Sequence, residues 1–192
     1  MEENKNVEKK FFNKDNFTFW VISFFTYCLI GWLYEVIWEA AIGNGFVNRG
    51  FLYGPYLPIY GFGMLVLLFL LRKMIKNKVK IGKVPVTPVA IFISVLFIAS
   101  IIEYSASFIM ELIFHKRWWD YSYDLINING RVSLRNSSCL ALGATCLIYI
   151  VYPLLQKFVP KISQKAQKVI STVLLITISV DFVITILGYI VK

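Results

Sequence analysis

Five carboxylates lie inside or at the ends of long apolar stretches of this 192-residue chain. They are Glu35, Glu39, Glu103, Glu111 and Asp181. An ionised side chain near the centre of a bilayer costs about 2.5–3.5 kcal/mol on insertion scales, so such residues usually form pairs, bind something or mark a pathway. The chemistry open to carboxylates at this depth is to hold a cation, to relay a proton or to bind a cationic group of a substrate.

The spacing of four of these acids predicts two polar helix faces. Acidic or hydroxyl side chains recur every four residues in two stretches, namely Glu35 and Glu39, and Glu103, Ser107 and Glu111. Residues at this spacing lie on one face of a helix, and a polar face in a membrane turns toward the bundle interior. The alternative to a binding site is structural pairing with a loop arginine, for example of Glu35 with Arg49 or of Glu103 with Arg131. For Arg49 the expected carboxylate partner is Glu35 or Glu103, or Asp120 if the two outer segments touch.

Asp181 is the only acidic residue in the last apolar stretch. About twelve residues into the predicted helix, it should lie near the middle of the membrane. Two interpretations stay open for it. One is a direct role in binding, and the other is a protonated acid that donates one hydrogen bond to a neighbouring helix, because desolvation disfavours the charged form.

The composition predicts the class of fold that positions these acids. The chain is 58% hydrophobic and 16% charged, more apolar surface than a soluble domain of this size could bury in one core. We therefore expect an all-α membrane protein with about five transmembrane helices, each long enough for a hydrocarbon layer of about 30 Å. The expected spans are residues 17–40, 56–71, 88–114, 137–155 and 169–190, which form one transmembrane domain over 17–192 after a cytoplasmic polar tail, 1–16.

The net charge of +9 does not indicate a nucleic-acid partner, because the basic residues gather in short segments between the apolar stretches. There they fit orientation and contact with anionic lipid. Fourteen of the 20 Lys and Arg fall in the tail and in the segments 72–83 and 156–168. The positive-inside rule then predicts a multi-pass protein of the plasma membrane with its N-terminus in the cytoplasm.

Two segments on the predicted outer side are not ordinary loops. Residues 43–63 and 115–138 contain helix-breaking glycine or proline together with many aromatic and aliphatic residues. Irregular backbone at membrane depth is tolerated only inside protein or beside a watery cavity, so re-entry into the membrane is one alternative for both. Each segment follows a helix with two glutamates and carries an asparagine, a glycine and an arginine, which suggests a duplicated unit of helix, dipping segment and helix.

Together these features predict a polar funnel open to the outside. Its expected substrate- or ion-binding residues are Glu35, Glu39, Asn48, Arg49, Glu103, Glu111, Arg131 and Asp181.

Motifs for catalysis or cofactor binding do not occur in the sequence. His115 is the only histidine, and the three cysteines (Cys28, Cys139, Cys146) have neither a disulfide framework nor a metal-ligand spacing. Walker, nucleophile-elbow and dinucleotide fingerprints do not occur. We therefore predict no catalytic residue, no metal and no cofactor, do not favour an enzyme, and expect no ATP hydrolysis by this chain alone.

Several short motifs resemble those of a known bacterial family. They are residues 31–35 (GWLYE), 48–55 (NRGFLYGP), 58–61 (PIYG), 118–122 (WWDYS) and 127–132 (NINGRV). Over about residues 20–155 the chain resembles the ABC-transporter type IV, or CmpB-like, family of integral membrane proteins, with a less clear match in the last helix. The resemblance implies a membrane permease component.

The leading hypothesis is a transport protein, either a permease or a membrane substrate-binding subunit. It would depend on an ATPase partner or on an ion gradient, and its small-molecule or ionic substrate is not identified by the sequence. One alternative is an intramembrane enzyme for a lipid or polyprenyl substrate, in which carboxylates and arginines hold a divalent ion and a phosphate. Another is a small oligomeric channel, since five short-looped helices leave little room for a pore within one chain.

Overall fold

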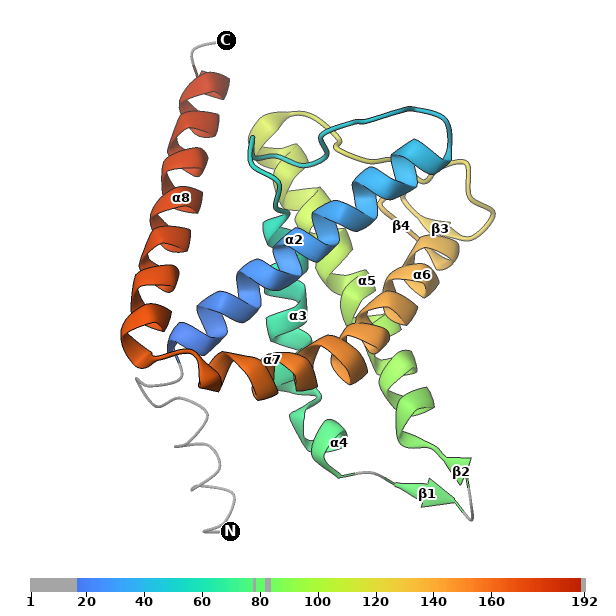
Figure 1. The fold of residues 1–192 in the computed structure, drawn as a ribbon. Helices are drawn as coiled ribbons and strands as arrows, with labels where there is room; N and C mark the ends of the chain where they lie inside the picture. The colour runs from blue at the N-terminus through green and yellow to red at the C-terminus, as the bar shows by residue number, and fades with distance from the viewer. Residues whose placement is uncertain (1–16, 78, 82–83, 191–192) are drawn as a thin grey trace. The chain divides into compact units, whose positions relative to one another are not determined.

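The computed structural model describes residues 17–77, 79–81 and 84–190. The polar tail predicted over residues 1–16 lies outside them. Helices make up most of the described chain, and the expected all-α membrane architecture is confirmed (Figure 1). The helices are α2 (Phe17–Ala41), α3 (Pro58–Leu70), α4 (Arg72–Lys76), α5 (Thr87–Phe114), α6 (Leu134–Cys146), α7 (Tyr152–Phe158) and α8 (Gln164–Ile190).

Short strands and irregular helical turns complete the secondary structure. Strand β1 (Lys80–Ile81) pairs antiparallel with β2 (Val84–Pro85), and β3 (Asn127–Ile128) pairs antiparallel with β4 (Val132–Ser133). A π-helical turn, Leu147–Val151, joins α6 to α7, and a 3-10 turn, Val159–Lys161, follows α7. These pieces make Leu134–Lys161 one continuous helical stretch.

Within the described residues, four helices are long and apolar enough to cross a membrane: α2, α5, the stretch Leu134–Lys161, and α8. The stretch Leu134–Lys161 corresponds to the span predicted over residues 137–155 and begins three residues earlier. The Ser133 side chain caps its first helix by accepting the Asn136 amide at 3.1 Å. The last begins at Gln164 instead of residue 169. Its lysine-rich first turn resembles a loop in composition, but Ser163 precedes it and accepts the Ala166 amide at 3.3 Å.

Helix α3 is shorter than the predicted second span. Its 13 residues rise about 20 Å, less than a hydrocarbon layer of about 30 Å. The segment before it supplies the missing length. We call residues 42–57 the first returning segment, because it leaves the end of α2 and comes back to Cys28, whose carbonyl accepts the Leu57 amide at 3.0 Å. Cys28 lies about 20 Å from the C-terminal end of α2, so relative to that helix the segment is re-entrant.

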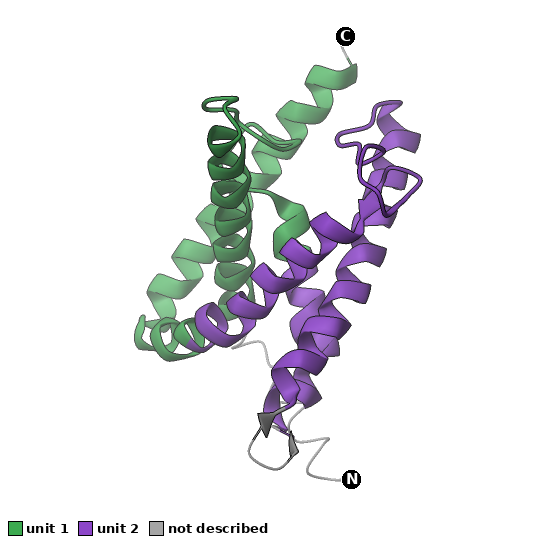
Figure 2. Ribbon diagram, turned by 90° about the vertical axis from the view of Figure 1, so that its right-hand side faces the viewer, with its two compact units in different colours: residues 1–62, 154–192 green, residues 63–153 purple. Residues whose placement is uncertain are grey.

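Contacts divide the chain into two compact units, residues 1–62 with 154–192 and residues 63–153 (Figure 2). The boundary falls inside α3 and again at the start of α7. We describe each unit by itself, and the single transmembrane domain expected over residues 17–192 stays a prediction.

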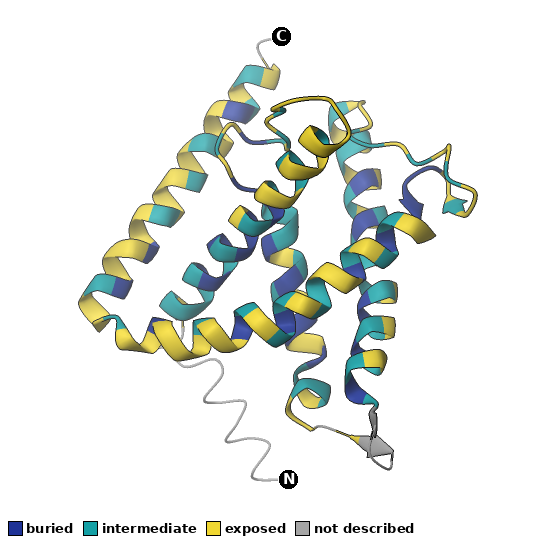
Figure 3. Ribbon diagram, turned by 45° about the vertical axis from the view of Figure 1, so that its right-hand side comes forward, coloured by how far each residue is buried: buried dark blue, intermediate teal, exposed yellow. Residues whose placement is uncertain are grey.

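In the first unit, α2 packs against α8, and the two helices begin side by side. Thr18 donates to the Gln167 side chain at 2.9 Å, and Ser171 donates to the Thr18 carbonyl at 3.3 Å. The buried residues of α8 are all polar, namely Gln167, Ser171 and Thr185. Its other faces are mainly exposed, as Figure 3 shows along the helix. The exposed side chains are largely apolar, which fits a helix whose outside is covered by lipid.

In the second unit, α5 packs against α6 and against β4. The buried side of α5 follows a helical spacing through Ile91, Val95, Glu103 and Ser107. The side of α6 that is buried carries small residues, Ser137 and Ala141. Small side chains let two membrane helices approach closely. We call residues 115–133 the second returning segment, because it brings the start of α6 back to the level of Glu103, where Asn136 donates to that acid at 2.9 Å.

Close approach of α3 to α2 predicts the effect of adding one methyl group. A Cβ at Gly61 would lie 2.4 Å from the Cys28 sulfur, whereas a Cβ at Gly63 of the same helix would meet nothing within 4 Å. We expect Gly61→Ala to lower the free energy of unfolding by about 1–3 kcal/mol through overpacking. Gly63→Ala should be neutral or slightly stabilising, because alanine favours helix. Thermal unfolding in detergent measures both, and equal stability of the two variants would contradict this packing.

Candidate functional site

The first charged cluster joins α2 to the first returning segment. The guanidinium of Arg49 lies between two carboxylates, with Nε 3.6 Å from Glu35 and Nη1 3.6 Å from Glu39. The Tyr60 hydroxyl, from the first turn of α3, donates to Glu35. The predicted carboxylate partner of Arg49 is therefore confirmed as Glu35, with Glu39 as a second partner that was not expected. The Arg49 side chain remains 37% exposed.

Asn48 holds the returning segment beside this cluster. Its side-chain oxygen accepts the Trp32 indole N–H at 2.7 Å, and its side-chain nitrogen donates to the Tyr53 carbonyl at 3.0 Å. At the other end, Asn44 donates to Glu39 at 2.6 Å. Because an amide side chain can both donate and accept, Asn48 joins the Trp32 indole of α2 to the backbone of the returning segment.

The second charged cluster joins α5 to the second returning segment. Arg131 donates to Glu111 and, at 3.1 Å, to the Ser107 hydroxyl. Its guanidinium also lies 5.4 Å from the ring centre of Phe108, a distance at which a cation is attracted to an aromatic face. Arg131 is only 8% exposed. A second arginine, Arg117, contacts Glu111 from the solvent side at 3.3 Å.

Glu103 is buried on the same helix face, two turns deeper than Glu111. One of its oxygens accepts two hydrogen bonds, from the Tyr121 hydroxyl at 3.0 Å and from the Asn136 side chain at 2.9 Å. The suggested pairing of Glu103 with Arg131 is wrong, because the ion pair of Arg131 is made with Glu111. The two glutamates of this helix therefore differ in environment, one in contact with arginines and one supported by neutral donors.

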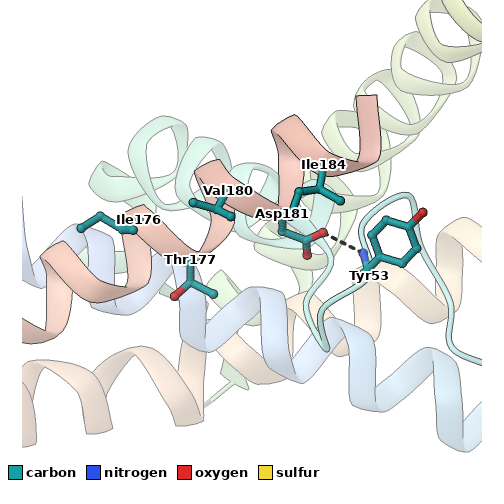
Figure 4. Close-up of a pocket in the computed structure, with 6 residues that line it drawn as sticks. All are labelled: Tyr53, Ile176, Thr177, Val180, Asp181 and Ile184. Atoms are coloured by element: carbon teal, nitrogen blue, oxygen red, sulfur yellow. Dashed lines mark hydrogen bonds between the residues drawn. The ribbon is translucent and has the colours of Figure 1, made fainter. Parts of the chain in front are cut away.

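Asp181 anchors the first returning segment to α8. Its carboxylate accepts the amide N–H groups of Tyr53 at 3.1 Å and Gly54 at 2.8 Å, and the hydroxyls of Tyr56 at 2.5 Å and Thr185 at 3.2 Å. Since each oxygen accepts a backbone N–H, which can only donate, this geometry favours the carboxylate over a protonated acid that donates. Beside it, Tyr53 and the apolar face of α8 border an open groove of about 710 Å³ (Figure 4).

Outside the long helices, Asp120 is the central residue of the WWDYS motif in the second returning segment. Hydrogen bonds from the hydroxyl and then the amide of Ser122 hold the pKa of Asp120 below its ordinary value, against a smaller opposing effect of desolvation. The neighbouring Arg117 adds a further, smaller decrease of that pKa. Asp120 thus stabilises the turn of this loop by accepting hydrogen bonds from Ser122.

The two clusters share a plan that the sequence suggested only in outline. In each, a long helix carries two glutamates, a returning segment contributes an arginine, and the third residue of the next helix donates to the deeper glutamate. These third residues are Tyr60 in α3 and Asn136 in α6. The arginines differ in position, since Arg131 immediately precedes β4 while Arg49 is nine residues before Pro58. The shared plan supports the duplication hypothesis without identical spacing.

The structure brings the expected site residues together in two groups. Glu35, Glu39, Asn48 and Arg49 gather in the first unit, where Tyr53 links Asn48 to Asp181. Glu103, Glu111 and Arg131 gather in the second. One funnel shared by all eight stays a prediction. Among the described residues, no three His, Cys, Asp or Glu side chains form a group that could hold a metal ion.

Sequence reasoning missed three donors of these clusters: Tyr60, Tyr121 and Asn136. A signal existed for two of them. Tyr60 lies in the PIYG motif and Tyr121 in the WWDYS motif, but the sequence alone assigned no partner to either hydroxyl. Asn136 gave no signal beyond being polar near the start of a span.

Long apolar helices with charged clusters inside them define an integral membrane protein. Residues 22–186 match the model of the family described as "Putative ABC-transporter type IV", and the chain belongs to this family. It is therefore a membrane protein of a transport-related, ABC-transporter-like family. Neither the curated proteins nor the solved structures contain a significant match to the chain.

The anchor at Asp181 can be tested by its removal. Asp181→Ala would leave two backbone donors and the Tyr56 hydroxyl unpaired, so we expect the free energy of unfolding to fall by about 3 kcal/mol. The free energy of unfolding of Asp181→Asn should lie between those of the wild type and Asp181→Ala, because one acceptor oxygen remains. Ser179→Ala, at an exposed position of the same helix, is the matched control for thermal unfolding in detergent. An Asp181→Ala protein as stable as the control would show that the anchor contributes nothing.

Proposed function

We propose that this chain is the membrane-embedded permease or substrate-binding subunit of a transporter. In this proposal the cluster of Glu35, Glu39, Asn48 and Arg49 binds the polar part of the substrate or a coupling ion. The cluster of Glu103, Glu111 and Arg131 forms the corresponding polar site of the second unit. Asp181 acts by positioning the segment that carries Asn48 and Arg49.

The observation that carries the proposal is the loose, accessible pairing of Arg49. Its two contacts of 3.6 Å are longer than the 2.7–2.9 Å typical of charge-assisted hydrogen bonds. Arg131, the arginine of the other cluster, is by comparison buried and in closer contact with its acid. Arg49 is instead half-exposed between two acids, which leaves room for water or for a ligand group. We therefore assign ligand contact first to the Arg49 cluster.

The energy source in this proposal is a separate subunit or an ion gradient. The sequence contains no Walker motif, and the family is described as an ABC-transporter type, which supports an ATPase partner. The acids of the two clusters would equally suit a proton or sodium gradient.

We also propose that the protein crosses the plasma membrane several times and that its N-terminus lies in the cytoplasm. This orientation follows from the distribution of Lys and Arg. Cysteines placed at Asn77 and at Gln164 should react with a membrane-impermeant maleimide only when the cytoplasmic face is open. A cysteine at Asn127 should react in intact cells. Labelling of Asn127 from the cytoplasm would contradict both this orientation and the outward-facing site.

The transport proposal predicts a partner and a role for the planar guanidinium. The tagged chain, purified from its native membranes, should bring a subunit with a nucleotide-binding motif, and the complex in liposomes should hydrolyse ATP. Arg49→Lys should reduce this activity at least tenfold, because an ammonium cannot contact two carboxylates as the fork does. Arg135→Lys is the control, since Arg135 is 77% exposed and pairs with Asp124, which is not a member of the cluster.

A chain that energises transport by a gradient would purify without an ATPase. Liposomes loaded with pH- or sodium-sensitive dyes should then report ion entry that Arg49→Lys reduces. A preparation with neither an ATPase partner nor gradient-dependent ion movement would overturn the proposal.

A further inference from the structure

A cluster of four lysines lies at the turn between α7 and α8 in the first unit. We call it the basic corner; its members are Lys157, Lys161, Lys165 and Lys168. All four are exposed, and within the described part of the chain none forms an ion pair. The sequence has no acidic residue between Asp124 and Asp181, so no acid close to the lysines in the sequence neutralises them.

The backbone of the basic corner is held in a fixed shape. The buried side chain of Gln167 donates to two carbonyls of the turn, Val159 at 3.0 Å and Ile162 at 2.8 Å. Its oxygen accepts the Thr18 hydroxyl at 2.9 Å, and Val159 is itself buried. These contacts tie the inside of the turn to α2. The lysines are thus presented together on a rigid element and not on a free loop.

An exposed aromatic ring lies among the lysines. Phe158 is 52% exposed, and the ammonium groups of Lys157 and Lys161 lie 5.5 Å and 5.4 Å from its ring centre. An apolar ring flanked by lysines suits the boundary of a bilayer, where the ring enters the acyl region and the ammonium groups reach the phosphates.

The position of the corner places it at a membrane surface. The helical stretch Leu134–Lys161 ends there, and α8 begins three residues later. Two successive spanning helices can be joined by so short a turn only at the level of the head groups. This follows whichever leaflet the corner faces.

We propose that the basic corner is a binding site for the phosphate head groups of anionic phospholipids. The lysines supply the charge, Phe158 supplies insertion into the bilayer, and Gln167 fixes the backbone of the turn that carries them. This inference does not rest on the proposed transport function, because it uses neither charged cluster. An anionic membrane surface attracts each nearby lysine with a gain in affinity of about fivefold, so four together distinguish anionic from zwitterionic lipid strongly.

The test measures lipid retention by the full chain. Purified protein in detergent is mixed with phosphatidylglycerol or with phosphatidylcholine, and bound lipid is counted by native mass spectrometry alongside thermal unfolding. We expect retention and stabilisation with phosphatidylglycerol only. Replacing all four lysines by glutamine should reduce that affinity at least tenfold, and replacing them by arginine should preserve it, which separates loss of charge from misfolding. Phe158→Ala should weaken binding without any change of charge.

A matched control changes basic residues elsewhere. The triple variant Arg72→Gln, Lys73→Gln and Lys76→Gln in α4 removes charge from another connecting segment and should keep phosphatidylglycerol binding. Inorganic phosphate should neither compete nor stabilise. Equal losses in the α4 variant, or protection by free phosphate, would overturn the assignment to a lipid site in this corner. The same holds if lipid binding is unchanged in the glutamine variant while association with a partner subunit is lost.

Discussion

Irregular backbone inside a membrane needs hydrogen-bond partners that water cannot supply, and in the first unit a carboxylate from another helix provides two of them. Asp181 accepts the amides of Tyr53 and Gly54, while the carbonyl of Cys28 accepts that of Leu57. These contacts let the chain leave α2, return along it and start α3 at half its height. Asn48 and Arg49 lie beside Glu35 and Glu39 because the C-terminal part of their segment is fixed by these contacts.

The same constraint is met differently in the second unit. There β3 and β4 pair their own backbone groups, Ser133 caps α6, and the Trp119 indole donates to the Arg131 carbonyl at 3.0 Å. The returning segment therefore needs no acid from a distant helix. Its arginine is closely packed, with Arg131 against Glu111, Ser107 and Phe108, whereas Arg49 is left accessible. Two similar arrangements thus give one firm cluster and one open cluster.

The sequence predicted what depends on local composition and missed what depends on distant contacts. Helix α5 was expected over residues 88–114 and occupies Thr87–Phe114, because an uninterrupted apolar run with proline at its start leaves little freedom. The two acid faces followed from a four-residue spacing. The role of Asp181 could not be predicted, since its partners are about 125 residues earlier in the chain and two of them are backbone amides. The late start of α3 was missed because it also depends on a distant contact, the hydrogen bond from the Leu57 amide to the Cys28 carbonyl.

The polar residues of α8 have a consequence for how that helix is retained. Gln167, Ser171, Asp181 and Thr185 fall on one face, and the α8 side chains buried in the protein are polar. For a water-soluble helix, separation would expose oily surface to water, but here lipid already covers the outside and would simply cover the inside as well. Attachment of α8 therefore depends on a few hydrogen bonds and on a few apolar contacts, such as those of Ile178 with the buried cluster of Cys28, Leu52 and Tyr56 and of Phe182 with Phe51. Evolution could exchange the exposed isoleucines, valines and leucines of α8 freely, as long as the positions that make these contacts kept their chemistry.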